Sequence, residues 1–213
     1  MARVYLEFGA KRVFACSPDW PGWSRVAKNE EAALDALMTY VPRYRVVAER
    51  AGLTFEPGDP EVVERVKGGS TTDFGAPQAV PELALEPVGA EEAARLAALV
   101  RAAWQVFDEV RAVSPAELRK GPRGGGRDRD KMVAHVVEAE RSYARQIGVR
   151  HRPFEVDDTA ALAALRDDIE AVLARPSDGG PLRPGGWPAR YAAHRIAWHV
   201  LDHVWEMQDR STP

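Results

Sequence analysis

Hydrophobic and polar residues alternate near the start of the chain with the two-residue period of a β-strand. Residues 3–8 (RVYLEF) and 12–16 (RVFAC) show this alternation on either side of a short turn, which predicts a β-hairpin. The proline- and glycine-rich stretch 18–23 (PDWPGW) predicts a loop, and residues 61–67 (EVVERVK) predict a further strand.

A helical pattern lies between these strands. Asn29 stands where the N-cap of a helix that starts at Glu30 is expected, and Glu30 and Glu31 suit the positive end of that helix. Pro42 should end or kink the helix, and a second helical stretch should continue to Gly52. Residues 1–75 are therefore predicted to form a small α+β domain.

The pattern changes after a stretch rich in glycine, proline and threonine at residues 68–88, so we expect a linker over 76–89. Beyond it, apolar residues recur every three or four positions in four segments, and residues 90–210 are predicted to form an all-α four-helix bundle. The stripes contain Leu96, Leu99, Val100, Ala103, Phe107 and Val110; Met132, Val136, Ala139, Tyr143 and Ile147; Leu162, Leu165, Ile169, Val172 and Leu173; and Tyr191, Ile196, Val200 and Met207.

The last of these helices, expected over residues 187–210, carries the most informative chemistry. His199 and His203 are four residues apart, so they lie about 40° apart around the helix axis and their rings can converge on one point. Two imidazoles of one metal site need this geometry. The alternative is a pair of core or interface histidines, each bonded to a carbonyl group or to Asp202 and Glu206 nearby.

A third histidine, His135, borders the apolar stripe of the helix expected over residues 130–147 and should face the interior. His194 lies about 140° from His199 around its helix and is expected to pack elsewhere. His151 lies in a loop and is expected at the surface.

Composition narrows the protein class. The 29 basic and 32 acidic side chains give a net charge of −3, which argues against nucleic acid or an anionic membrane as the partner. The single cysteine, Cys16, excludes an internal disulfide framework and is expected to be a small buried side chain. The N-terminal residues lack the apolar run of a signal peptide, and no apolar segment is long enough to span a membrane. We therefore expect a soluble, cytoplasmic protein.

Two family resemblances add expectations. The order of two strands, a PDWPG turn and an EEAALDAL helix resembles the small HicB-like module over about residues 3–50, which implies a role in binding or regulation. The helices containing HVVEAERSYARQIG and AWHVLDHVWEMQDR look like those of the DinB-like superfamily, over about residues 90–210. That resemblance implies a four-helix bundle with a metal ion held by His135, His199 and His203.

Three neutral imidazoles leave further coordination positions open, as at a catalytic metal ion, and they suit zinc or nickel. The DinB-like resemblance implies a transferase or isomerase that uses a low-molecular-weight thiol. Hydrolysis by a metal-activated water is also compatible with such a site. Glu138 and Glu206 are candidates to orient an imidazole or a water molecule, although either can instead pair with Arg141 or Arg145.

Two functions stay open on the sequence alone. The first is a metal-dependent transferase or hydrolase with a small-molecule substrate, and the second is a non-catalytic stress-response or regulatory protein with a structural metal. A homodimer is compatible with both. The basic stretch 119–131 is interpreted mainly as a solvated linker, with Arg123, Arg127 and Arg129 as a secondary means of attracting an anionic substrate.

Overall fold

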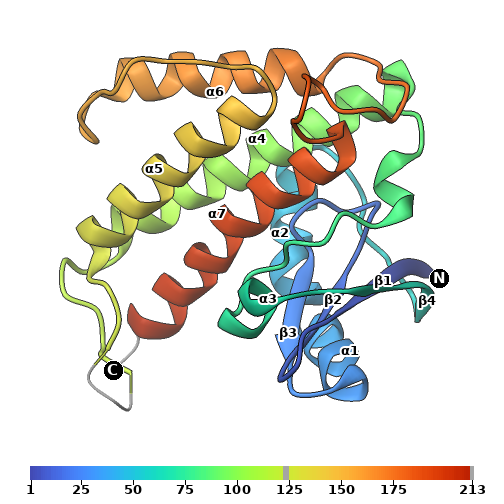
Figure 1. The fold of residues 1–213 in the computed structure, drawn as a ribbon. Helices are drawn as coiled ribbons and strands as arrows, with labels where there is room; N and C mark the ends of the chain where they lie inside the picture. The colour runs from blue at the N-terminus through green and yellow to red at the C-terminus, as the bar shows by residue number, and fades with distance from the viewer. Residues whose placement is uncertain (122–124, 212–213) are drawn as a thin grey trace.

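In a computed structural model of the protein, residues 1–121 and 125–211 are described. Four strands and seven α-helices follow one another in these residues, with one short 3-10 helix at Glu82–Leu85 (Figure 1). The strands are β1 (Ala2–Phe8), β2 (Val13–Cys16), β3 (Ser24–Ala27) and β4 (Pro60–Lys67). The helices are α1 (Glu30–Thr39), α2 (Val41–Arg50), α3 (Ser70–Phe74), α4 (Ala90–Val113), α5 (Arg129–Gln146), α6 (Thr159–Leu173) and α7 (Ala189–Ser211).

The strands form one mixed sheet in the order β3-β2-β1-β4. The predicted hairpin is confirmed, because β1 pairs antiparallel with β2 and Tyr5 lies opposite Cys16. Strand β4 joins the other edge of β1 in parallel, after the crossover through α1 and α2. The prediction missed β3, which begins directly after the loop 18–23 and pairs antiparallel with β2.

Helices α1 and α2 begin and end close to where their sequence signals predict. The side chain of Asn29 accepts a hydrogen bond from the backbone N–H of Ala32 at 2.9 Å and so caps α1. Tyr40 separates the two helices, and Pro42 lies in the first turn of α2, where a missing N–H costs nothing.

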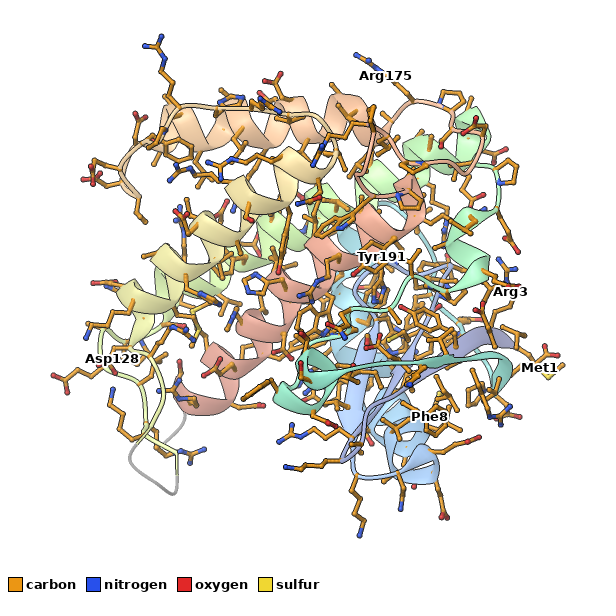
Figure 2. All side chains as sticks on the ribbon, viewed as in Figure 1. Met1, Arg3, Phe8, Asp128, Arg175 and Tyr191 are labelled. Atoms are coloured by element: carbon orange, nitrogen blue, oxygen red, sulfur yellow. The ribbon has the colours of Figure 1, made fainter. Side chains whose placement is uncertain are left out.

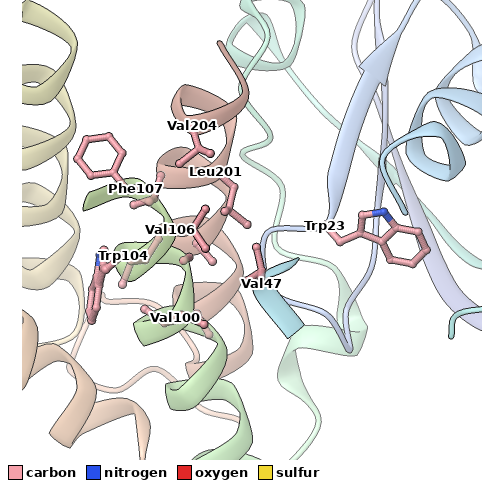
Figure 3. Close-up of a cluster of buried hydrophobic side chains, with 14 of the residues drawn as sticks. Trp23, Val47, Val100, Trp104, Val106, Phe107, Leu201 and Val204 are labelled. Carbon is pink, nitrogen blue, oxygen red and sulfur yellow. The ribbon is translucent and has the colours of Figure 1, made fainter. Parts of the chain in front are cut away.

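The long C-terminal helices contact one another and also the N-terminal half. Helix α4 packs on α7, α6 and α2, and α5 packs on α7 and α6. Figure 1 shows α6 far from the sheet, whereas α7 runs through the middle of the molecule with α5 and the sheet on different sides. Figure 3 shows Leu201 and Val204 of α7 beside Val106 of α4, with Val47 of α2 close to them.

The predicted fold class, an α+β module followed by an all-α four-helix bundle, is wrong. The chain forms a mixed α/β structure, in which one hydrophobic core runs from the sheet through α1 and α2 into α4–α7. The physical reason lies in α7, whose apolar residues surround the helix: the side that faces away from α4 and α5 is covered by the N-terminal half. There the ring of Trp198 contacts Phe14 of β2, and Trp205 contacts Tyr40.

The predicted linker 76–89 contacts the rest of the protein at several points. The buried carboxylate of Glu7 on β1 accepts hydrogen bonds from the backbone N–H groups of Gln78 and Ala79, and the hydroxyl of Tyr191 on α7 donates to the carbonyl oxygen of Gln78. Figure 2 shows Tyr191 at this junction. Whether residues 1–75 and 90–210 fold independently, as the sequence predicts, is a question for experiment.

Candidate metal centre

Helix α7 supplies two of the three histidines. Every residue from Pro188 to Leu201 is buried except Arg195. Packing therefore restrains the side chains in this part of the helix. His199 and His203 lie one turn apart on the same side, and only 7% and 8% of their surfaces are exposed. Their ring centroids are 4.8 Å apart, with the ring planes nearly perpendicular.

His135 completes a cluster of three from the neighbouring helix α5. Its Nε2 atom lies 3.2 Å from Nε2 of His199, and its ring centroid lies 5.1 Å from that of His203. One ring nitrogen from each of the three side chains falls within 4.8 Å of the others, which is close enough to bind a metal ion. Within residues 1–121 and 125–211, no further His, Cys, Asp or Glu joins this group.

The three histidines suit a metal ion in two respects: their ring nitrogens are common metal ligands, and two of these nitrogens have the separation that a metal ion requires. Two nitrogen ligands of a tetrahedral zinc ion, each about 2.0 Å from the metal, are about 3.3 Å apart. The separation between the Nε2 atoms of His135 and His199 is 3.2 Å. The donor set therefore fits a divalent transition metal of the type that imidazole prefers.

Glu206 holds the third ring in a defined orientation. Its Oε2 atom lies 2.9 Å from Nδ1 of His203, and Nη1 of Arg210 donates to its other oxygen at 2.6 Å. The hydrogen bond to His203 is the main reason why the pKa of Glu206 lies below its ordinary value, so this group is a carboxylate. Because a carboxylate can only accept from Nδ1–H, Nε2 is the nitrogen of His203 that is left to face a metal ion.

Glu138, the other candidate for this role, does not join the cluster. Its side chain is 70% exposed, and it pairs with Arg141 at 3.1 Å on the surface of α5. The sequence offered both glutamates at equivalent helical spacings, and only the tertiary structure distinguishes them.

Burial keeps two of the histidines neutral. The pKa of His199 lies well below its ordinary value, first because burial disfavours the charged ring and then because His203 and His135 are close. Burial also lowers the pKa of His135, with smaller contributions from His203 and from the charge of Arg127. Neutral imidazoles are the form that binds metal ions.

Sequence reasoning missed Arg195, the partly exposed cation one turn before His199. Its guanidinium carbon lies 4.7 Å from the ring centroid of Trp198 and 5.3 Å from that of Tyr143, while Tyr143 contacts the ring of His199. The available signal was the four-residue spacing to His199, which places both side chains on one face of the helix.

The basic stretch before α5 contributes less than its sequence suggests. Arg127 is exposed, and its charge contributes to lowering the pKa of His135 and His199. Arg129 instead donates to the carbonyl oxygen of Ser114 and to Asp130. Arg123 lies outside the described residues.

The remaining histidines and the cysteine lie apart from the cluster. His194 is buried against Tyr5, as its position around the helix predicts. His151 is only partly exposed and lies 2.8 Å from Asp168. Cys16 is fully buried, as predicted, and burial raises the pKa of its thiol to about 12.

A cavity of about 290 Å³ lies beside Glu206, the partner of His203. Glu206 lines it, together with Arg25 and Tyr40 from the N-terminal half and Asp202, Trp205, Asp209 and Arg210 from α7. Arg25 lies over the ring of Tyr40 and donates to Asp202 at 3.1 Å. Strand β3 therefore supplies Arg25 to the cavity that Glu206 lines.

Comparisons with known proteins do not identify the chain: no family model, no curated protein and no solved structure matches it. In the described residues, no helix combines the length and the apolar character needed to cross a membrane.

Proposed function

We propose that His135, His199 and His203 bind one divalent transition-metal ion and that this site is the active site of an enzyme acting on a small molecule. The observation that carries the proposal is the cluster itself, with two Nε2 atoms 3.2 Å apart and Glu206 on the far nitrogen of His203. Zinc and nickel suit three imidazole nitrogens best.

A catalytic site is supported over a purely structural one by the number of ligands. Structural zinc sites in proteins are closed by four side chains, whereas catalytic sites use three and leave a position for water or substrate. The described residues supply three. His135 is only partly buried, so the cluster lies near the surface and not at the centre of the core.

The chain's own residues have separable tasks. His135, His199 and His203 would hold the metal ion, which when bound would supply Lewis acidity and so lower the pKa of a water or thiol. Glu206 fixes the ring of His203 through Nδ1, and Arg210 holds Glu206 in that position. The reaction we propose is transfer of a low-molecular-weight thiol or hydrolysis. Thiol transfer rests on the resemblance of the histidine motif to the DinB-like superfamily alone.

Metal analysis of the purified protein tests the binding site. We expect about one zinc or nickel ion per chain, and loss of it in His199→Ala and His203→Ala. Glu206→Gln should bind the metal about tenfold to a hundredfold more weakly, because the partner that orients His203 is weakened. Glu138→Gln is the matched control on α5 and should keep the metal affinity of the wild type.

Equal metal content in the wild type and in a His199→Ala/His203→Ala double variant would refute the binding site. The activity is tested separately, by comparing metal-loaded and chelated protein with a panel of thiols and a model electrophile, and with a panel of esters and amides. If neither panel gives metal-dependent turnover, the alternative of a regulatory protein with a structural metal should replace the enzyme.

A further inference from the structure

Arg195 is the one arginine of α7 whose charge no carboxylate neutralises among the described residues. Arg190 pairs with Glu92 and Arg210 pairs with Glu206. Arg195 forms no ion pair within residues 1–121 and 125–211, and its Nη1 atom is buried there without a hydrogen-bond partner. A buried guanidinium nitrogen without a partner is costly. Arg190 and Arg210 also have one such nitrogen each, but only Arg195 lacks a carboxylate partner as well, so its charge calls for an explanation.

Two aromatic side chains hold this guanidinium in place. Trp198 comes from the same helix and Tyr143 from α5, and their ring centroids lie 4.7 and 5.3 Å from the guanidinium carbon. Such stacking restrains the side chain. Arg195 is only partly buried, and of its three guanidinium nitrogens Nη1 alone is buried without a partner, so the edge formed by Nε and Nη2 is the one that an anion can reach. Arg195 is thus prepared to bind a planar or tetrahedral oxyanion through two parallel hydrogen bonds.

The surroundings of the histidine cluster add to the positive charge. The charge of Arg195 and that of Arg127, in the loop before α5, both help to lower the pKa of His199. The nearest carboxylate of the cluster, Glu206, is already engaged by His203 and Arg210. A substrate that carries a negative charge would therefore be attracted to this site.

We propose that Arg195 binds an oxyanion, either a carboxylate or a phosphate, on the substrate of the histidine site. This inference rests on the proposed function and names its substrate class as small organic acids or phosphates. Arg195 precedes His199 by one helical turn, about 6 Å along the axis. An acid group at Arg195 and a reacting atom at the histidines can thus belong to one small molecule.

The test observes the Arg195 side chain directly, by NMR of its Nε–H group in protein labelled with nitrogen-15 arginine. Acetate and inorganic phosphate are the probes, added at constant ionic strength to metal-free and to zinc-loaded protein. Arg195→Lys assigns the resonance. Arg141 is the internal control, because it also stacks on an aromatic ring, that of Phe154, and also has one buried guanidinium nitrogen without a partner, but already pairs with Glu138.

We expect a saturable shift of the Arg195 resonance at anion concentrations at least tenfold below those that shift the resonance of Arg141. A stronger response to acetate assigns the acid as a carboxylate, and a stronger response to phosphate assigns it as a phosphate. No saturable shift in either form of the protein, or equal responses of the two arginines, would overturn the inference and leave Arg195 as a structural contact between α5 and α7.

The outcome of this test can be distinguished from that of the metal analysis. If Arg195 responds in metal-free protein but no histidine variant changes the metal content, the anion site stands and the metal centre falls. If metal analysis succeeds and Arg195 does not respond, the metal centre stands without this substrate class. Arg195→Met should retain bound metal, because Arg195 is not a ligand.

Discussion

His194 and His199 lie five residues apart on the same helix, and their surroundings give them different properties. His199 faces His135 and His203, whereas His194 faces the ring of Tyr5. Both ring nitrogens of His194 are buried and have no hydrogen-bond partner among the described residues. Burial is the main cause that lowers the pKa of His194 to about 3, with a smaller contribution from the charge of Arg195.

The low pKa of His194 predicts a pH-dependent stability. In the unfolded chain this residue titrates near its ordinary pKa of about 6.5, so below that pH the unfolded state binds a proton that the folded state does not. The contribution of His194 therefore destabilises the protein as the pH falls from about 6.5 towards the folded-state pKa, which is about 3.

Replacement of His194 by leucine removes this proton uptake. We compare the free energy of unfolding of His194→Leu with that of the wild type. When the pH falls from about 7.5 to about 5, this difference should shift by about 2 kcal/mol in favour of the variant, as linkage to a single proton requires. Urea unfolding of metal-free protein at the two pH values measures the difference. The same stability difference at both values would show that His194 is protonated in the folded state or is accessible to water.

At the scale of elements, the loop 18–23 matters because it packs directly on α7. Gly22 has a positive φ of 87°, and a Cβ atom there would lie 2.8 Å from Cδ1 of Leu201 and 3.0 Å from Ala197. The neighbouring Trp23 is fully buried and donates from its indole N–H to the carbonyl oxygen of Leu37. Figure 3 shows Trp23 on the sheet side of the cluster, away from α4.

This close approach predicts the effect of adding one methyl group. Gly22→Ala should lower the free energy of unfolding by about 3 kcal/mol, because a left-handed backbone conformation and a clash with α7 act together. Gly52→Ala is the control: Gly52 has a φ of 73°, but a methyl group added there would meet nothing within 4 Å. Its cost should be about 1 kcal/mol, from the backbone alone.

Chemical denaturation of the two variants measures both costs. Equal destabilisation by Gly22→Ala and Gly52→Ala would mean that the loop moves away from α7 without cost. The packing of this loop on α7 would then contribute little to the free energy of unfolding.

At the scale of the whole molecule, the N-terminal half and the C-terminal helices bury part of their surfaces against each other. Phe14 packs on Trp198, Tyr5 on His194 and Tyr40 on Trp205, and Arg25 pairs with Asp202. Removal of the N-terminal half would expose the covered side of α7, including Leu201, to water. Exposed apolar area of this extent is unfavourable by about 25 cal/mol per Å².

A fragment of residues 88–213 tests whether the C-terminal helices fold alone. From the shared core we expect this fragment to aggregate or to unfold without cooperativity, in contrast to the full chain. Circular dichroism during heating, with size-exclusion chromatography, compares the two. Cooperative unfolding of a monomeric fragment that retains bound metal would show instead that the helices form an independent domain, as the glycine- and proline-rich stretch 68–88 predicts.

Local signals predicted most of the elements. Alternation identified the hairpin of β1 and β2, Asn29 and Pro42 marked helix boundaries, and the three- and four-residue periods located α4–α7 within one or two residues. Strand β3 was missed because its four residues follow a loop and acquire their structure by pairing with β2. Helix α3 is only five residues long and was missed because it lies in the glycine-, proline- and threonine-rich stretch 68–88.

The sequence by itself determined the histidine pair, since a spacing of four residues on a helix has one geometric meaning. It also placed His135 on the inner side of its helix. Only the tertiary structure decided that His135 meets His199, that Glu206 rather than Glu138 contacts the cluster, and that a sheet covers α7. Periodicity shows that a helix face is buried, but it does not specify the neighbour that buries it, because apolar contact is non-directional and long-range in sequence.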